Sequence, residues 1–224
     1  MITYAIGDIH GMIKPLIRLL VDIKLDAGRK PYKLVFLGDY IDRGPDSKAV
    51  IQCLIDLKKD LGPENVITLM GNHEDMLLNA YRDWKISYGT NTLTSYDALF
   101  TGNIPDSHMD FIKNLDLFHE TKYNIFVHAG IDFEEYENNK SMENQVISSL
   151  LWKRYPSGFN PDNFSKVLVH GHTPHLYVEK LPNRINLDSA AVFNGKLSAA
   201  RFEPSSGQPV TILSVKINPD DFIR

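Results

Sequence analysis

The stretch KLVFLGDYIDRG, residues 33–44, shows the pattern from which we predict the fold class of this chain. Its first five residues form a short apolar run, which is typical of a buried strand. Gly38 ends the run, and the carboxylates of Asp39 and Asp42 follow at once. The same order occurs twice more nearby: Thr3 to Ile6 ends in Gly7-Asp8, and Val66 to Met70 ends in Gly71-Asn72-His73.

Two segments of helical spacing separate these three predicted strands. Residues 14–25 place Leu16, Leu19 and Ile23 on one face, and residues 47–57 form a second helix with Ser47 as its cap. The β-α-β-α-β order predicts a parallel sheet covered by helices. Ligands bind at the carboxyl ends of the strands in such sheets, so we expect the polar clusters to lie close together.

The rest of the chain divides into an insertion and a strand-rich tail. Residues 79–122 predict a mainly helical insertion that borders the cleft, with apolar positions such as Trp84 and Phe100 among turn-formers such as Gly102. Two further apolar runs end in His128 and in His170-Gly171-His172. The tail predicts a β-meander that forms a second sheet from short strands at 185–187, 191–193, 197–202 and 210–215.

Composition excludes several classes of protein. The 224 residues are 43% hydrophobic, which is too apolar for intrinsic disorder, and one cysteine cannot form an internal disulfide. No apolar run is long enough for a membrane helix, and Asp8 and His10 interrupt the first apolar segment before a secretory signal can form. A net charge of −4 argues against nucleic-acid binding. We therefore expect a cytoplasmic catalytic domain spanning residues 1–224.

The strand ends carry the residue types of a metal centre. Asp8 and His10 point the same way in an extended segment, and Asp39 has two oxygens that can bridge two ions. Asn72, His128 and His172 add an amide oxygen and two imidazoles. Such a mixture suits Mn, Fe or Zn rather than Ca, and six ligands with one bridging Asp indicate two divalent ions.

Each cluster taken singly is also typical of an ordinary turn, and only their recurrence at five strand ends favours a site. His108, His119 and His175 lack this context, and we interpret them as surface or packing residues. The role of His170 stays open. Cys53 lies on the apolar face of its helix, so we interpret it as a packing residue rather than a nucleophile.

The motifs, in their order, carry a family resemblance. Gly-Asp-x-His-Gly at 7–11, Gly-Asp-x-x-Asp-Arg-Gly at 38–44, Gly-Asn-His-Glu at 71–74, His-Ala-Gly at 128–130 and Gly-His-Thr at 171–173 resemble the phosphoprotein phosphatase branch of the calcineurin-like metallophosphoesterases. Residues 151–154 (Leu-Trp-Lys-Arg) resemble its short bacterial and bacteriophage-lambda type.

The resemblance implies an α/β fold, a four-layer α/β/β/α sandwich of two mixed sheets flanked by helices. It implies one metal held by Asp8, His10 and Asp39, and a second held by Asp39, Asn72, His128 and His172. It also implies that a water activated between the metals attacks phosphorus. His73 would be the general acid, Asp42 would orient it, and Arg43 and Arg154 would bind the phosphoryl oxygens.

The chain departs from the family pattern in three places. The usual Asp-Ser/Thr-Gly-Ala reads Asp188-Ser189-Ala190-Ala191, the usual Gly-Gly of the next turn is Asn194-Gly195, and a Trp-x-x-x-Gly-Gly-type segment appears as Trp84 to Gly89 followed by Thr90. None of these positions is a predicted metal ligand. They bear on substrate preference, because the insertion and the last turn are expected to border the cleft.

The predicted function is that of a metal-dependent phosphomonoesterase of the serine/threonine protein phosphatase type. Its substrates would be phosphoproteins or small phosphoesters, with Mn as the expected metal and with no membrane or nucleic-acid partner. The alternative is a dinucleoside-tetraphosphate hydrolase, for which Tyr88, Tyr96 and Arg82 could contact the nucleosides. A nuclease and a phosphoprotein-binding module without catalysis are the remaining hypotheses. The sequence does not indicate the oligomeric state.

Overall fold

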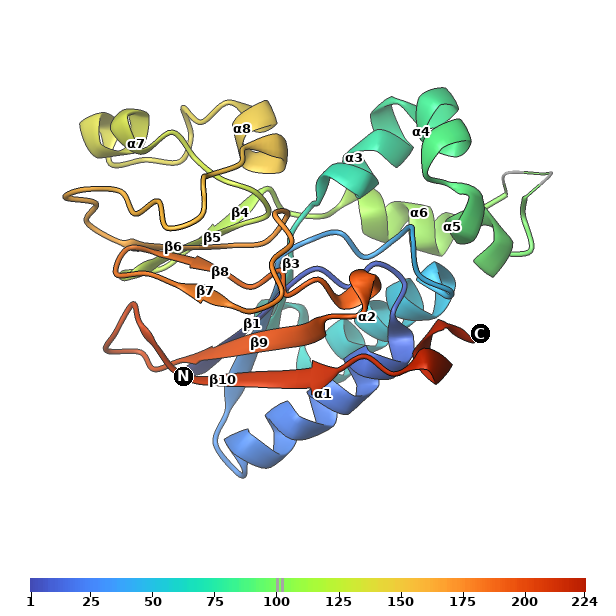
Figure 1. Ribbon diagram of the computed structural model, residues 1–224, viewed down its shortest axis with the longest axis horizontal. Coiled ribbons are helices and arrows are strands. Elements are labelled where there is room, and N and C mark those ends of the chain that lie inside the picture. Colours follow the sequence, from blue (N-terminus) through green and yellow to red (C-terminus); the bar gives the residue numbers. More distant parts are fainter. Residues whose placement is uncertain (100, 102) are drawn as a thin grey trace.

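Two five-stranded sheets face each other in the computed structural model, which describes residues 1–99, 101 and 103–224. Helices lie outside both sheets, so the predicted α/β/β/α sandwich of two mixed sheets is confirmed (Figure 1). Phe100 and Gly102, which the insertion was predicted to contain, lie outside the described residues. No helix in the described part of the chain has the length and hydrophobicity that crossing a membrane requires.

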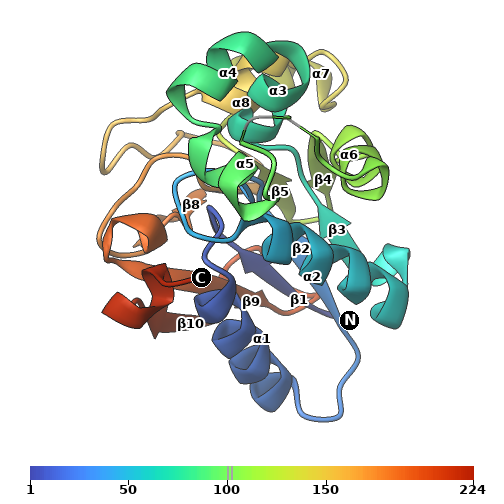
Figure 2. The same ribbon diagram turned by 90° about the vertical axis from the view of Figure 1, so that its right-hand side faces the viewer.

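The first sheet carries the β-α-β-α-β unit. Its strands β1, β2 and β3 run parallel, and β9 pairs antiparallel with β1. The strand order is β10-β9-β1-β2-β3, and α1 and α2 lie against its outer face (Figure 2). The bounds are β1 Ile2–Ile6, α1 Ile13–Ala27, β2 Tyr32–Phe36, α2 Ser47–Leu61, a 3₁₀ turn η1 Pro63–Asn65, β3 Val66–Thr68, β9 Lys196–Phe202 and β10 Pro209–Lys216.

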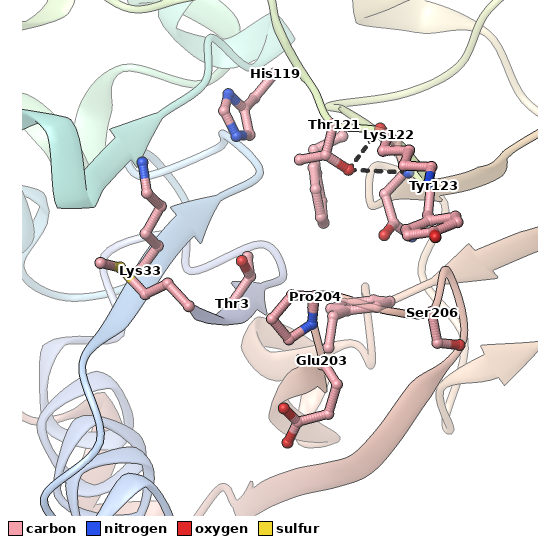
Figure 3. A pocket seen from close by; sticks show the side chains of 13 residues that line it. Thr3, Lys33, His119, Thr121, Lys122, Tyr123, Glu203, Pro204 and Ser206 are labelled. Carbon is pink, nitrogen blue, oxygen red and sulfur yellow. Dashed lines mark hydrogen bonds between the residues drawn. The ribbon is translucent and has the colours of Figure 1, made fainter.

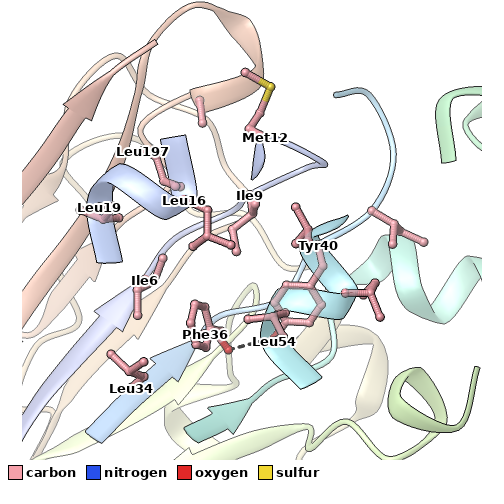
Figure 4. Packing of buried hydrophobic residues seen from close by; sticks show 14 of the residues in the cluster. Ile6, Ile9, Met12, Leu16, Leu19, Leu34, Phe36, Tyr40, Leu54 and Leu197 are labelled. Carbon is pink, nitrogen blue, oxygen red and sulfur yellow. Dashed lines mark hydrogen bonds between the residues drawn. The ribbon is translucent and has the colours of Figure 1, made fainter. Parts of the chain in front are cut away.

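Helix α1 packs on this sheet through the apolar face that its periodicity predicts. Leu16, Leu19 and Ile23 are fully buried, against Ile6 and Phe36 among others in the same cluster (Figure 4). Burying one such side chain contributes about 1.5–3 kcal/mol. Helix α2 is capped by Asp46, whose side chain accepts from Ala49 N, so the predicted capping role of Ser47 is wrong.

The second sheet has the order β4-β5-β6-β8-β7, with β5, β6 and β8 parallel. Val35 and Leu37 from the first sheet pack against Val169 and Leu187 from this one, which makes the core between the sheets. The bounds are β4 Phe118–Glu120, β5 Asn124–Val127, α7 Phe133–Asn139, α8 Ile147–Trp152, β6 Val167–His170, β7 Glu179–Lys180 and β8 Arg184–Asn186.

The tail does not form a sheet of its own, which corrects the predicted meander. Strand β8 joins the second sheet, whereas β9 and β10 extend the first. Residues 191–193 form a 3₁₀ turn, η2 Ala191–Phe193, instead of a strand. The free edge of β1 explains the difference, because β9 satisfies that edge with the antiparallel register Ile6↔Ala199. Local alternation predicts a strand without specifying its partner.

The secondary structure within the described part of residues 79–122 consists of short helices and one strand. They contain α4 Tyr81–Ser87, α5 Thr90–Ser95, α6 Asp106–Lys113 and the short strand β4. Helix α3, Asn72–Asn79, leads into them from the end of β3, and a last 3₁₀ turn, η3 Pro219–Phe222, closes the chain. Helices α3 to α5 lie beside the carboxyl ends of the parallel strands of the first sheet, which Asp8, Asp39 and Asn72 follow (Figure 1).

Candidate metal centre

Two groups of potential metal ligands share the carboxylate of Asp39. One joins Asp39 to His10 and His73, and the other joins it to His128 and His172. Within each group the ligand atoms all lie within 4.8 Å of one another, and every residue is buried. Asp39 Oδ2 lies 3.3 Å from His10 Nε2, and Oδ1 lies 3.5 Å from His128 Nε2. The two oxygens thus face different imidazoles, as a bridging carboxylate requires.

The tautomers of His10 and His128 favour metal binding. Nδ1 of His10 lies 2.8 Å from Ile41 O, and Nδ1 of His128 lies 2.9 Å from Leu37 O. A carbonyl oxygen only accepts, so each Nδ1 carries the hydrogen and donates it. Burial lowers the pKa of His10 to about 3 and also lowers that of His128. Both Nε2 atoms therefore present lone pairs inward, as ligating histidines do.

Two further observations are typical of a site that binds a cation. His128 Nε2 lies 3.0 Å from Asn72 Oδ1, which places two lone-pair acceptors in contact if the amide keeps this orientation. His172 Nε2 is buried without a hydrogen-bond partner among the described residues. Buried polar atoms normally have partners, and a cation would satisfy all three. The donor set of imidazole, carboxylate and amide oxygen fits divalent metal ions.

Asp8 lies beside these groups but is a member of neither. Its carboxylate oxygens accept the backbone N–H of His172 at 3.0 and 3.2 Å. Burial raises its pKa well above the usual range, and the charges of Asp188 and Asp39 raise it further. Burial also raises the pKa of Asp188 to about 7. The three buried carboxylates of Asp8, Asp39 and Asp188 repel one another, so their arrangement favours the binding of a cation.

His73 forms a pair with Asp42. His73 Nδ1 donates to Asp42 Oδ2 at 2.6 Å, and both side chains are buried. Burial opposes protonation of His73, but the charges of Asp39 and Asp42 outweigh it, so the pKa of His73 is raised. The other ring nitrogen is left for the centre, and the ring packs edge-on against His10 with centroids 4.8 Å apart. This arrangement suits a proton donor oriented by a carboxylate.

Backbone strain is concentrated at the site. Ten described non-glycine residues have positive φ, and half of them are predicted site residues: His10, Asp39, Asp42, Arg43 and His172. Left-handed backbone costs about 1–2 kcal/mol per residue, so the surroundings must hold it. Glu74 does so for the loop at Asp39. Its carboxylate accepts four backbone N–H groups, those of Asp39, Tyr40, Ile41 and Gly71, at 2.8–3.1 Å.

Two exposed arginines stand at the centre. Arg43 Nη1 lies 2.5 Å from His10 Nε2, and the guanidinium lies over the ring of Phe193. Arg154 follows α8 and makes no side-chain hydrogen bond with the described residues, yet its charge lowers the pKa values of His128, His172 and Asp188. Both are therefore close enough to bind an anion there.

Comparison with known proteins identifies the family. Residues 1–203 match the sequence profile described as calcineurin-like phosphoesterase. The chain belongs to this family. Its members are metal-dependent phosphoester hydrolases, which agrees with the ligand groups around Asp39.

Two curated relatives and one solved structure illustrate the similarity. A PrpE protein of Anoxybacillus flavithermus, named an asymmetrical bis(5'-nucleosyl)-tetraphosphatase, is 28% identical over 90% of this chain and 91% of its own. Serine/threonine-protein phosphatase 1 of Salmonella typhimurium is also 28% identical, over 90% and 92%. A cold-active protein-tyrosine phosphatase of a Shewanella species superposes with a TM-score of 0.69 at 18% identity, covering 96% and 80%, and shows the common fold.

His170 is fully buried and lies two residues before the predicted ligand His172. Its Nδ1 lies 3.0 Å from Gly171 O, and its Nε2 accepts from Arg184 Nη1 at 3.0 Å. Arg184 is buried and forms an ion pair with Glu179. His170 belongs to neither ligand group, and the buried Arg184 contacts its Nε2, so we interpret His170 as a structural neighbour of His172. Cys53 is half-buried, and burial raises its pKa to about 11, which disfavours a thiolate.

Sequence reasoning assigned no role at the site to five residues, which are Trp84, Thr92, Trp152, Asp188 and Phe193. Asp188 was noted only as part of a family departure. Trp84 and Thr92 both bond to Asp42, and Trp152 packs edge-on against His172 with centroids 6.0 Å apart. The sequence feature that came closest to indicating these residues was the departure from the family pattern, because segments 188–191 and 84–89 both lie at the metal centre. Of the suggested nucleoside contacts, Tyr88 reaches His73, whereas Tyr96 is buried and bonds to His108.

A cavity of about 350 Å³ lies at the opposite end of the two sheets (Figure 3). It is lined from the amino ends of β1 and β2 by Thr3 and Lys33 and from the second sheet by His119 and Tyr123. No predicted ligand reaches it, because all of those follow the carboxyl ends of their strands. His119 stacks on Phe126 there, in keeping with a packing role.

Proposed function

We propose that this metallophosphoesterase hydrolyses dinucleoside tetraphosphates, with Mn²⁺ as the metal. The observation that carries the proposal is a set of three exposed aromatic rings, each in contact with a residue of the centre. They are Tyr88, Trp152 and Phe193, with 44, 45 and 54% of their surface exposed. Exposed aromatic rings beside a phosphate site are suited to stacking on nucleobases.

The three rings come from separate elements that surround the centre. Tyr88, after α4, packs edge-on against His73 with centroids 5.1 Å apart. Trp152 ends α8 and packs against His172, and Phe193 ends η2 beneath Arg43. A phosphoserine peptide needs one phosphate site, whereas a dinucleotide also needs platforms for two bases. The relatives named bis(5'-nucleosyl)-tetraphosphatases add support.

The proposed chemistry assigns a role to each side chain. Two divalent ions supply a more acidic water and neutralise phosphoryl oxygens when bound. Asp8, His10, Asp39, Asn72, His128 and His172 would hold them. Arg43 and Arg154 bind the remaining phosphoryl oxygens, and His73 donates a proton to the leaving oxygen as the phosphorus–oxygen bond breaks. Asp42 keeps Nδ1 of His73 protonated, so Nε2 is the donating atom.

A second candidate is the serine/threonine protein phosphatase predicted from the motifs. Serine/threonine-protein phosphatase 1 supports it with the same identity as the PrpE relative. Assignment to the phosphoprotein phosphatase branch, of the bacterial and bacteriophage-lambda type, belongs to this candidate. Both reactions use the same metal ligands and the same acid, so the surroundings of the centre must distinguish them.

The deciding experiment compares kcat/KM for diadenosine tetraphosphate and for a phosphothreonine peptide. The protein is chelated, Mn²⁺ is restored, and both rates are measured side by side. A higher value for the dinucleotide supports the proposal. A higher value for the peptide favours the second candidate, and no rate on either substrate rejects both.

Single variants test the role of the rings. Tyr88→Ala, Trp152→Ala and Phe193→Ala should each raise KM for diadenosine tetraphosphate about tenfold, since stacking one base contributes roughly 1–3 kcal/mol. KM for p-nitrophenyl phosphate, which has no base, should change far less. Tyr123→Ala, at the opposite cavity, is the matched control. Equal changes for both substrates would reject stacking as the role of these rings.

A further inference from the structure

Helices α4 and α5 reach across to the carboxylate of Asp42. The indole N–H of Trp84 donates to Asp42 Oδ2 at 2.7 Å, and the hydroxyl of Thr92 donates to Oδ1 at 2.5 Å. Asp42, Trp84 and Thr92 are all fully buried. With His73 as a third donor, both oxygens of Asp42 are occupied, and two of the three donors come from the segment 79–122.

The same segment holds the backbone at Asp42 and Arg43. These two successive residues have φ of 71° and 65°, which is strained for residues with side chains. Asp42 N donates to Thr92 Oγ1 at 2.9 Å, and Asn91 Nδ2 donates to Arg43 O at 2.6 Å. Without these contacts the turn has fewer restraints against relaxing to ordinary φ values, and Asp42 would turn away from His73.

Gly89 in turn fixes Trp84. A Cβ at Gly89 would lie 2.9 Å from the indole ring, so the ring rests directly on the glycine backbone. Gly89 N also donates to Trp84 O at 2.8 Å. The φ of Gly89 is −70°, so the position needs glycine for space rather than for conformation. The contact explains why a glycine at position 89 accompanies Trp84, and it requires no contact between Trp84 and substrate.

We propose that Trp84 and Thr92 are positioning residues, through which the segment 79–122 holds Asp42 so that His73 is aimed at the leaving oxygen. This inference rests on the proposed hydrolase function with His73 as acid. It assigns the segment a role in the chemical step, in addition to bordering the cleft.

The test uses two substrates that differ in their need for a proton. Phenyl phosphate releases a basic phenolate, whereas p-nitrophenyl phosphate releases a stabilised one that needs little proton transfer. Trp84→Phe should lower kcat for phenyl phosphate about tenfold, and lower the ratio of the two kcat values, because a hydrogen bond to a charged group is lost. KM should stay within about twofold, since Trp84 does not contact substrate.

A double-mutant cycle on kcat distinguishes a positioning role from a general structural role. In the His73→Asn background, Trp84→Phe should cause no further loss of kcat, because both act through one proton donor. Thr92→Val keeps the side-chain shape and should reproduce the effect of Trp84→Phe. Thr94→Val is the matched control on the same helix, where the hydroxyl makes no hydrogen bond with the described residues.

The outcomes separate this inference from the function on which it rests. Equal losses on both aryl phosphates, or independent losses in the cycle, would overturn the positioning role while leaving the hydrolase intact. If the Mn²⁺-supplied unmodified protein hydrolyses neither the aryl phosphates nor diadenosine tetraphosphate, the proposed function fails, and the positioning role fails with it.

Discussion

The two ends of the paired sheets differ in what they bury. At the carboxyl ends of the strands, Asp8, Asp39 and Asp188 lie buried among imidazoles, and the backbone is strained at five predicted site residues. At the amino ends, the sheets part around the cavity beside Lys33 and Tyr123, where the lining is ordinary polar and apolar surface. In this protein, buried carboxylates that repel one another therefore mark the candidate active site better than the volume of a cavity does.

Asp39→Asn should produce the largest effect, because Asp39 is the one side chain that both ligand groups share. An amide offers one neutral oxygen instead of two charged ones, so affinity for both ions should fall. Loss of several kcal/mol of metal stabilisation corresponds to a decrease in kcat of roughly 1,000-fold. Bound metal per protein and kcat are the measurements.

Asp26→Asn is the control for that substitution, since Asp26 bonds to Tyr4 and Arg201 away from the centre. It should retain bound metal and activity. Normal metal content in Asp39→Asn would contradict the bridging role. It would also argue against a metal centre at the carboxyl ends of the strands.

Glu74→Gln should destabilise the fold as well as the site. The carboxylate accepts four backbone N–H groups, but a glutamine amide has only one acceptor oxygen, so two donors would face an NH₂ group. Two unsatisfied buried donors cost about 3 kcal/mol, which denaturant unfolding would measure. Glu64→Gln, at an exposed position, should change the unfolding free energy very little, and equal losses in both variants would refute this account.

Asp221→Asn tests whether a carboxylate outside the centre stabilises the fold, unlike the buried carboxylates at the centre. Burial raises the pKa of Asp8 and Asp188, whereas the hydrogen bond from Arg18 lowers the pKa of Asp221. A lowered pKa stabilises the fold above the ordinary value of 3.8, and the contribution is lost as pH falls through the lower folded value. Arg18 is partly exposed, so we expect a loss of only about 1 kcal/mol at pH 7.

Unfolding of the wild type and Asp221→Asn at a series of pH values measures this effect. The difference in unfolding free energy should be present at pH 7 and should shrink below about pH 4. A difference that does not change with pH would show that the ion pair with Arg18 is not its source.

Ala190→Gly should have the smallest effect and the opposite sign. Ala190 has φ of 60°, in the left-handed region that favours glycine, so its backbone is strained. Relief of about 1–2 kcal/mol exceeds the entropic cost of glycine, and we expect a net gain of about 0.5–1 kcal/mol. Ala199→Gly in the extended strand β9 should instead destabilise. Destabilisation by both substitutions would contradict strain at Ala190.

Sequence reasoning was most successful where structure follows local pattern. The apolar runs before Asp8, Asp39 and Asn72 became β1, β2 and β3, and the spacing of residues 14–25 became α1. It was wrong for the tail, because the residues of β9 do not specify that β1 is their neighbour. Ser47 illustrates the same limit: its hydroxyl accepts the N–H of Asp42 instead of capping α2.

The amino-acid sequence alone was therefore enough to predict the β-α-β-α-β order of the first 75 residues, the family, and the recurrence of polar residues at the strand ends. Those features depend on neighbours a few positions apart, and alternating or helical periodicity records them. The bonds of Trp84 and Thr92 to Asp42, 42 and 50 residues away, and the position of three aromatic rings at the centre became visible in the folded structure alone. Such contacts depend on how the elements pack in space, and no local spacing along the chain encodes them.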